Sequence, residues 1–200
     1  MANTNKPFGL RPVRHLNGAP WNGAVQKAYV SSLYGTAVFV GDPVVWSPTL
    51  TEKDPLAKYP TINVSAGTTG LLIRGVVTAI EPSPTNLSRQ YIPALTGGYV
   101  FICTDPDVVF QIQDDGSGTP AAVFVGQNAE CAAGSGGSTI SGLSSFVLDA
   151  STPTTTQAHN LHILGLSDIP GNELDDYAVW DVLLNTIENA TGRFLGVTAA

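Results

Sequence analysis

The sequence has little charge and almost no cysteine. Only 12% of its 200 residues are charged, whereas an ordinary soluble domain has about 25%. Hydrophobic residues make up 43%, which excludes a disordered chain, since disorder combines low hydrophobicity with high net charge. With only Cys103 and Cys131, a disulfide framework is excluded. We expect two small buried side chains, unless the fold brings the two thiols together as one bridge.

Long hydrophobic runs are also missing. The longest apolar stretch, residues 71–80, is interrupted by Arg74 and Gly75 and is far shorter than the ~20 residues that span a bilayer. Residues 1–16 contain no apolar core followed by a cleavage site, so we expect no secretory signal. These absences predict a protein that is made and kept soluble, without membrane contact.

Glycine and proline are abundant instead, with 21 and 14 copies, and they interrupt every stretch that would suit a long helix. Short runs rich in Val, Ile, Tyr, Phe and Thr lie between turn residues, which is typical of strands joined by turns. We expect strands near residues 25–31, 36–40, 43–47, 61–64, 71–80, 98–103, 107–113, 121–125, 145–149, 160–166 and 177–185. The spacing predicts an all-β fold, an antiparallel sandwich, jelly-roll or barrel-like body with long Gly/Ser/Pro loops. Helices stay open as an alternative for residues 121–134 and 174–190.

The first 23 residues form a separate segment by composition. Pro7, Pro12 and Pro20, together with three glycines, exclude a helix and leave no alternating run of strand length. The segment is nevertheless rich in apolar residues, so we expect an extended arm that docks on another surface. Residues 24–200 are then a single β-rich domain.

Charge is distributed unevenly along the chain. Residues 1–104 carry a net charge of +4 and residues 105–200 carry -11. The arm and the acidic half are complementary in sign, so we expect the arm to bind the acidic half of the same or a neighbouring subunit, or an acidic patch on a larger partner. The candidate partner-binding residues are Lys6, Phe8, Leu10, Arg11, Val13 and Arg14. The alternative is that these basic residues are ordinary surface residues and the acids only maintain solubility. Nucleic-acid binding is disfavoured because it requires a longer basic stripe.

The residues that usually carry chemistry are sparse. His159 and His162 are three apart, so on a strand they point to opposite faces and do not share a metal ion. Asp105 and Asp107 would suit a calcium ion or an acid pair, yet Asp-Pro-Asp between two strands is typical of a turn. Residues 134–138 resemble a phosphate loop only in glycine content, since no Walker lysine or helix pattern follows. No serine lies in a nucleophile elbow, and the sequence predicts no catalytic site, cofactor or metal.

Five blocks of the sequence occur in order across nearly the whole chain. They are MANTNKPFGLRPVRHLNGAPWNG at 1–23, FVGDPV at 39–44, DPDVVFQIQ at 105–113, VGQNA at 125–129 and LHILGL at 161–166. Together they resemble a family of tailed-bacteriophage structural proteins that decorate or cement the capsid.

The resemblance implies a non-enzymatic virion protein, made in the bacterial host cytoplasm, that binds the capsid exterior. Its partners are the major capsid protein and itself, as a homodimer or homotrimer. We expect the β-rich body to oligomerise through apolar strand faces while the arm lies in a groove of a neighbour, and many such contacts gain avidity over a shell. The alternatives are a neck, tail or host-glycan-binding protein with exposed aromatic side chains, or a glycan-active enzyme that uses Asp105 and Asp107.

Overall fold

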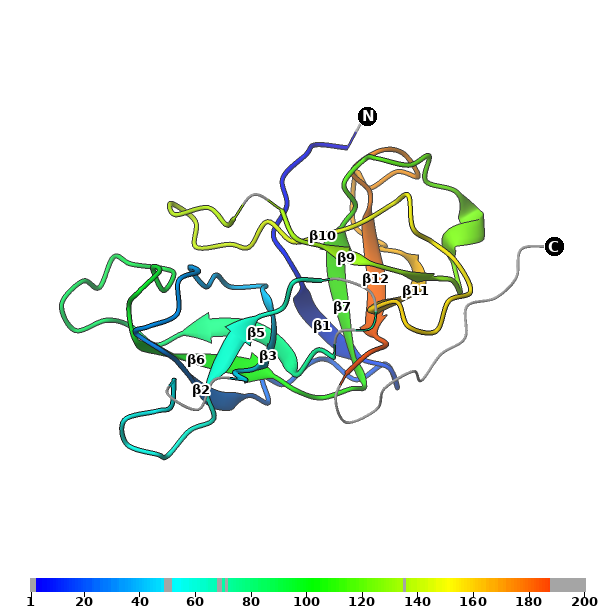
Figure 1. Cartoon of the computed structure of the whole chain (residues 1–200). Coiled ribbons are helices and arrows are strands. Elements are labelled where there is room, and N and C mark those ends of the chain that lie inside the picture. Colours follow the sequence, from blue (N-terminus) through cyan, green and yellow to red (C-terminus); the bar gives the residue numbers. More distant parts are fainter. Residues whose placement is uncertain (1–2, 49–51, 68–69, 71, 135, 188–200) are drawn as a thin grey trace.

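A computed structural model describes residues 3–48, 52–67, 70, 72–134 and 136–187. Within these ranges the chain forms two five-stranded sheets and one two-stranded sheet, and every strand pair in them is antiparallel (Figure 1). The helical structure in the described ranges is one 3-10 turn, η1, at Ala122–Phe124, and no helix there is long and apolar enough to cross a membrane. The prediction of an all-β, sandwich-like or barrel-like body is confirmed.

The first sheet, sheet A, is built around two buried strands. Its strands, in spatial order, are β1 (Arg11–His15), β7 (Val108–Gln113), β12 (Val179–Leu184), β11 (Leu161–Leu166) and β8 (Asn128–Ala129). Every residue of β7 is buried, including the polar Gln111 and Gln113. Phe110 and Trp180 pack on one face, in a first core. The chain itself covers both faces of β7.

The second sheet, sheet B, curls into a small barrel-like unit. Its strands, in spatial order, are β2 (Gln26–Val30), β6 (Gly98–Cys103), β5 (Gly75–Ile80), β3 (Pro43–Trp46) and β4 (Ile62–Val64). A parallel bridge between Tyr29 and Thr61 brings the two edges together, and the Tyr29 amide donates to the Pro60 carbonyl oxygen at 2.8 Å. All five strands place apolar side chains in a second core inside this curl.

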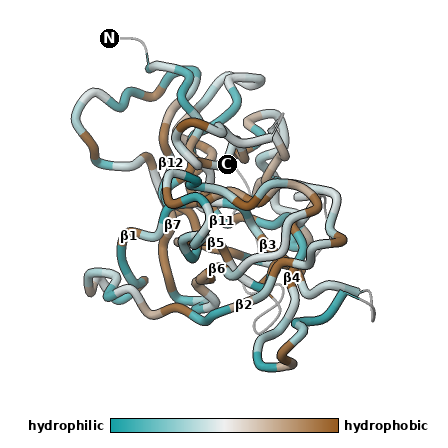
Figure 2. The backbone as a smooth tube through the Cα atoms, turned by 90° about the vertical axis from the view of Figure 1, so that its left-hand side faces the viewer, coloured by the Kyte–Doolittle hydropathy of each residue, from teal (hydrophilic) through white to brown (hydrophobic). Residues whose placement is uncertain are grey.

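The two cores meet at β5. Val76 belongs to the first core and its neighbour Val77 to the second, because successive strand residues point to opposite faces. The two-stranded sheet of β9 (Cys131–Ala132) and β10 (Val147–Leu148) adds Cys131 and Leu148 to the first core. Cys103 and Cys131 are both buried free thiols, so the expectation of two small core residues is confirmed. Figure 2 shows hydrophobic stretches within the strands and at several loop tips.

Several predicted strands are shorter or absent. Residues 36–40 form only isolated bridges, at Val38 and Val40, because the chain turns sharply at Gly41. Residues 121–125 contain the 3-10 turn η1 instead of a strand, and 177–185 contain a strand, β12. The described residues of 121–134 and 174–190 contain strands and no α-helix, so the helical alternative is wrong there. The predictions for 71–80 and 145–149 are right in their later or central parts only. The two-residue strands β8 and β9 are too short to leave a sequence pattern.

The prediction of an arm without a strand is wrong at residues 11–15. This segment is β1, which pairs antiparallel with β7 at the edge of sheet A. Pro12 is tolerated because an edge strand does not need every amide for pairing, and a register shift between Pro12 and Arg14 absorbs the irregularity. Sheet A therefore begins inside the segment that the sequence sets apart as an arm.

Candidate partner-binding surface

The apolar residues predicted to bind a partner pack on the chain itself. Leu10 is 1% exposed in the first core, and its amide donates to the Gly41 carbonyl oxygen at 3.0 Å. Phe8 and Val13 are half-buried. The expectation that Leu10 contacts another subunit is therefore corrected, because the side chain is already covered where β1 meets the turn before β3.

The basic residues of the same segment also have partners within the chain. Arg14 Nη2 lies 3.1 Å from Asp181 Oδ2 on β12, so the arm does meet the acidic half of its own subunit. The guanidinium of Arg11 lies over the Phe8 ring, 4.9 Å from its centroid, and donates to Gln111. Lys6 is exposed, and its backbone amide donates to the side chain of Gln113. Arg14 is consequently a stabilising residue of sheet A.

The first described residue, Asn3, fixes the N-terminal segment to the loop between β11 and β12. Its Nδ2 donates to the carbonyl oxygens of Glu173, Asp175 and Asp176 at 2.9–3.3 Å, and its Oδ1 accepts from the Glu173 amide. The contact joins the side-chain amide of Asn3 to backbone groups, so neither charge nor hydrophobicity in the sequence predicts it.

The two histidines singled out by the sequence lie in different surroundings. His162 is on β11, with Nδ1 2.7 Å from Asn128 Oδ1, and burial lowers the pKa of its imidazole. His159 precedes the strand, with Nε2 3.8 Å from Glu130 Oε1. Within the described part of the chain, no group of three or more metal-ligating side chains comes together.

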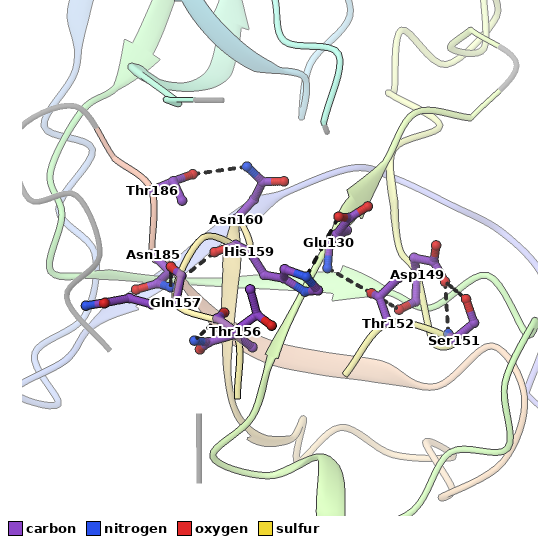
Figure 3. A network of polar contacts seen from close by, with 11 residues as sticks. Glu130, Asp149, Ser151, Thr152, Thr156, Gln157, His159, Asn160, Asn185 and Thr186 are labelled. Atoms are coloured by element: carbon purple, nitrogen blue, oxygen red, sulfur yellow. Dashed lines mark hydrogen bonds and ion pairs between the residues drawn. The ribbon is translucent and has the colours of Figure 1, made fainter. Parts of the chain in front are cut away.

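The polar network around His159 is arranged as a loop scaffold (Figure 3). The Ser151 hydroxyl donates to Asp149 Oδ1 at 2.6 Å and lies beyond Thr152 as seen from His159, while the imidazole faces Glu130. Ser151 and His159 thus face different carboxylates and do not form a serine–histidine relay. The network holds residues 149–160 against the β8–β9 segment.

The carboxylates Asp105 and Asp107 form a turn, as expected. The Asp107 amide donates to Asp105 Oδ1 at 2.8 Å, and Asp105 Oδ2 lies 3.4 Å from His15 Nδ1. This arrangement is an Asx turn at the start of β7. It uses one oxygen of Asp105 locally, as expected for a turn and not for a paired acid and base.

The aromatic side chains are largely covered by the chain's own groups. Tyr99 packs against Tyr29 and Tyr59, with ring centroids 5.3 and 5.6 Å away, and its hydroxyl donates to Asp54. The Lys27 ammonium lies 4.5 Å from the Tyr99 centroid and 2.6 Å from Glu81. Trp180 is fully buried, and Arg74 covers Trp46 at 4.7 Å. These contacts favour packing over a sugar-binding role for the aromatics.

One face of the molecule is made of three interlocked loops that the sequence did not single out. We define the neutral loop face as residues 31–41, 86–97 and 138–143, which lie together at one end of sheet B (Figure 1). Val38 and Ile92 exchange two backbone hydrogen bonds, the Leu95 amide donates to the Tyr34 carbonyl, and the Val40 amide donates to Gly142. The loops therefore present one joined surface.

This face carries exposed aliphatic side chains and almost no charge. The large hydrophobic residues that are more than 60% exposed on it are Leu33 (62%), Leu87 (78%), Leu95 (68%) and Ile140 (89%). Arg89 is the single charged residue in the three segments. In the sequence, this surface is marked only by aliphatic residues within loops rich in Ser, Thr, Pro or Gly. A search for strands does not identify such residues.

A pocket of about 300 Å³ opens beside the neutral loop face. It is lined by residues of four segments, namely Tyr34, Thr36, Ala37, Phe39, Asp42, Val64, Ser65, Ala66, Ala133, Gly134, Gly136, Gly137, Ser145 and Phe146. Asp42 is its only charged lining residue and is 3% exposed. Burial raises the pKa of the Asp42 carboxyl from 3.8 to about 6.

No protein-family model matches the sequence, and no curated protein or solved structure matches the chain.

Proposed function

We propose that this chain is a non-enzymatic virion protein that binds the outside of a phage capsid and cements neighbouring major capsid protein subunits. The observation that carries the proposal is the neutral loop face, on which several aliphatic side chains are more than 60% exposed beside a single charge. Exposed aliphatic side chains with little charge among them are typical of a protein interface, because desolvating them costs little and their burial is favourable.

The charge distribution supports one orientation on such a shell. The loop between β11 and β12 contains Asp168, Glu173, Asp175 and Asp176. It connects two neighbouring strands of sheet A and lies away from the neutral loop face (Figure 1). We infer that the neutral face contacts the shell while the acidic loop faces solvent.

The mechanism differs from the one the sequence suggests. Because Leu10 and Arg14 are engaged within the chain, the loops take the role assigned to the arm. Each copy makes a modest contact, and repetition over the shell provides avidity. The homodimer or homotrimer stays a prediction, since the strands expected to pair with another copy are covered within this chain.

Copy number tests the proposal. Quantitative mass spectrometry of purified virions should give a simple large fraction of the major capsid protein copy number. A dozen copies or fewer would instead place the chain at the neck or tail, as the rival proposal holds. Complete absence from the particle would overturn both.

A further inference from the structure

Asp42 is a buried carboxylate without a cationic partner. It follows the turn at Gly41 and precedes β3, and its Oδ2 accepts the Phe39 amide at 2.8 Å. Its second partner is the Ser144 hydroxyl. Both partners are neutral, and no basic side chain contacts Asp42 among the described residues.

A buried carboxylate of this kind destabilises the fold unless a cation pairs with it in the functional complex. Burying an ionised carboxyl is unfavourable, and two neutral hydrogen bonds compensate only in part. The raised pKa of Asp42 reports this imbalance in the isolated chain. The residue nevertheless stands in a structured turn, so its position is fixed before any partner arrives.

The residues that line the pocket around Asp42 suit a cationic group at the end of an aliphatic side chain. Phe39, Phe146 and Tyr34 supply aromatic surface, and ring faces attract cations. Phe39 is itself held by stacking on Tyr91, with centroids 5.1 Å apart and planes at 10°. A Cβ at Gly137 would stand 2.2 Å from the Phe39 ring, so only glycine lets the loop close this wall.

The pocket also lies in the right place. Tyr34 and Phe39 belong to the neutral loop face and line the pocket at the same time. A partner that covers the face therefore lies next to the pocket. The face itself offers a single cation, Arg89, which is not among the pocket residues.

We propose that the neutral loop face receives a lysine side chain of its shell partner, whose ammonium group enters this pocket and pairs with Asp42. This inference rests on the proposed function and names the chemistry of its central contact. Lysine fits better than arginine because the Phe39 amide and the Ser144 hydroxyl both already donate to the Asp42 carboxylate. An ammonium needs only one remaining acceptor position, whereas a guanidinium fork binds best to two parallel oxygens.

The isolated protein tests the pocket without a shell. The carboxyl carbon resonance of Asp42 is followed by NMR through a pH titration, with n-butylammonium as probe and n-butanol as its neutral match. We expect n-butylammonium to move the Asp42 titration midpoint to lower pH and n-butanol to leave it unchanged. A midpoint that n-butylammonium does not move, or that only n-propylguanidinium moves, overturns the lysine assignment.

Shell binding tests the biological role. Asp42→Asn keeps the shape of the side chain, and we expect it to weaken binding to purified shells roughly 30-fold or more, as when one member of a buried interfacial ion pair is lost. Asp115→Asn, on another loop, is the matched control and should bind like the parent chain. Equal binding by Asp42→Asn overturns the lysine pairing while the proposed function stands. Failure of the parent chain to bind shells overturns the proposed function, and the NMR titration still decides the pocket.

Discussion

At the scale of single residues, the polar groups that matter are the buried carboxylates. Asp42 and Asp114 are 3% and 0% exposed, whereas Asp105 and Asp107, the pair that drew attention in the sequence, form a surface turn. Gly41 directly precedes Asp42, and Gly116 lies two residues after Asp114, but acids close to a glycine are common in ordinary turns. Sequence alone therefore does not separate a buried structural acid from a turn acid.

Asp114 is expected to be essential for stability. Its oxygens accept hydrogen bonds from the Gly116 and Tyr177 amides and from the Trp180 indole at 2.7–3.0 Å. Asp114→Ala leaves three donors unpaired and should lower the free energy of unfolding by about 3 kcal/mol or more. Urea denaturation measures the loss. Asp176→Ala, at an exposed position, is the control and should change the value by less than about 0.5 kcal/mol.

Asp42 should make stability depend on pH in an unusual direction. Its pKa in the folded chain is about 6, above the ordinary value of 3.8, so the folded state holds the proton more tightly. Its contribution is fully present below about pH 4 and is lost as pH rises through 6, a total of about 3 kcal/mol. The other titratable groups nearby are the thiol of Cys131, whose pKa the Asp42 charge raises further, and the Tyr34 phenol in the pocket wall.

The comparison of two unfolding profiles between pH 4 and 8 checks this. Asp42→Asn cannot titrate, so its profile should lack the decrease across pH 4 to 6 that the parent chain shows. Profiles that stay parallel would contradict the assignment of this titration to Asp42.

At the scale of elements, the strands that the sequence predicts well are those with their own apolar pattern. β6, β7, β11 and β12 are found within one or two residues of their predicted bounds, because these largely buried strands are rich in Val, Ile, Leu and Phe. β1 is missed because its proline and basic residues suit only an edge, and its pairing depends on β7, which lies about a hundred residues away. Long-range pairing of this kind leaves no local pattern.

The junction between the N-terminal segment and the turn before β3 gives a sharp test. Gly41 has φ +97°, and a Cβ there would stand 2.5 Å from the Phe8 carbonyl oxygen. Gly41→Ala should therefore lower the free energy of unfolding by about 2 to 5 kcal/mol, from backbone strain and overlap together. Gly18, at φ +87° with open space around it, is the matched control, and Gly18→Ala should cost only about 1 to 2 kcal/mol. Equal losses in thermal or urea unfolding would show that the contact with Phe8 is not tight.

The candidate surface was harder to predict than the strands. The sequence identifies the loops and their lack of catalytic side chains, but it does not show that 31–41, 86–97 and 138–143 meet. Their contact depends on the Val38–Ile92 and Val40–Gly142 hydrogen bonds, which join segments far apart in the chain. The expectation that Leu10 contacts another subunit is corrected for the converse reason, because its side chain packs in the first core of the same chain.

At the scale of the whole molecule, the chain separates its functions by position. Sheet A holds the larger core and the acidic β11–β12 loop, whereas sheet B supports the neutral loop face. The small barrel-like unit gives these loops a rigid base, and under the proposed function this base lowers the entropy lost on binding. Residues 105–200 carry a net charge of -11, which favours solubility.

Charged substitutions at the loop tips test the face directly. The double variant Leu95→Asp with Ile140→Asp places two carboxylates where side chains 68% and 89% exposed now stand. We expect unchanged stability and at least roughly 30-fold weaker binding to purified shells, because the carboxylates must be desolvated at the interface. Leu56→Asp, 61% exposed on a loop outside the face, is the control and should bind normally in a co-sedimentation assay.

The account is tested most directly by a cryo-electron microscopy reconstruction of virions that carry this chain. It predicts density for the chain at repeated positions on the capsid exterior, with residues 31–41, 86–97 and 138–143 against the shell and the acidic β11–β12 loop toward solvent. Density confined to the neck or tail, or attachment to the shell through sheet A, would contradict it.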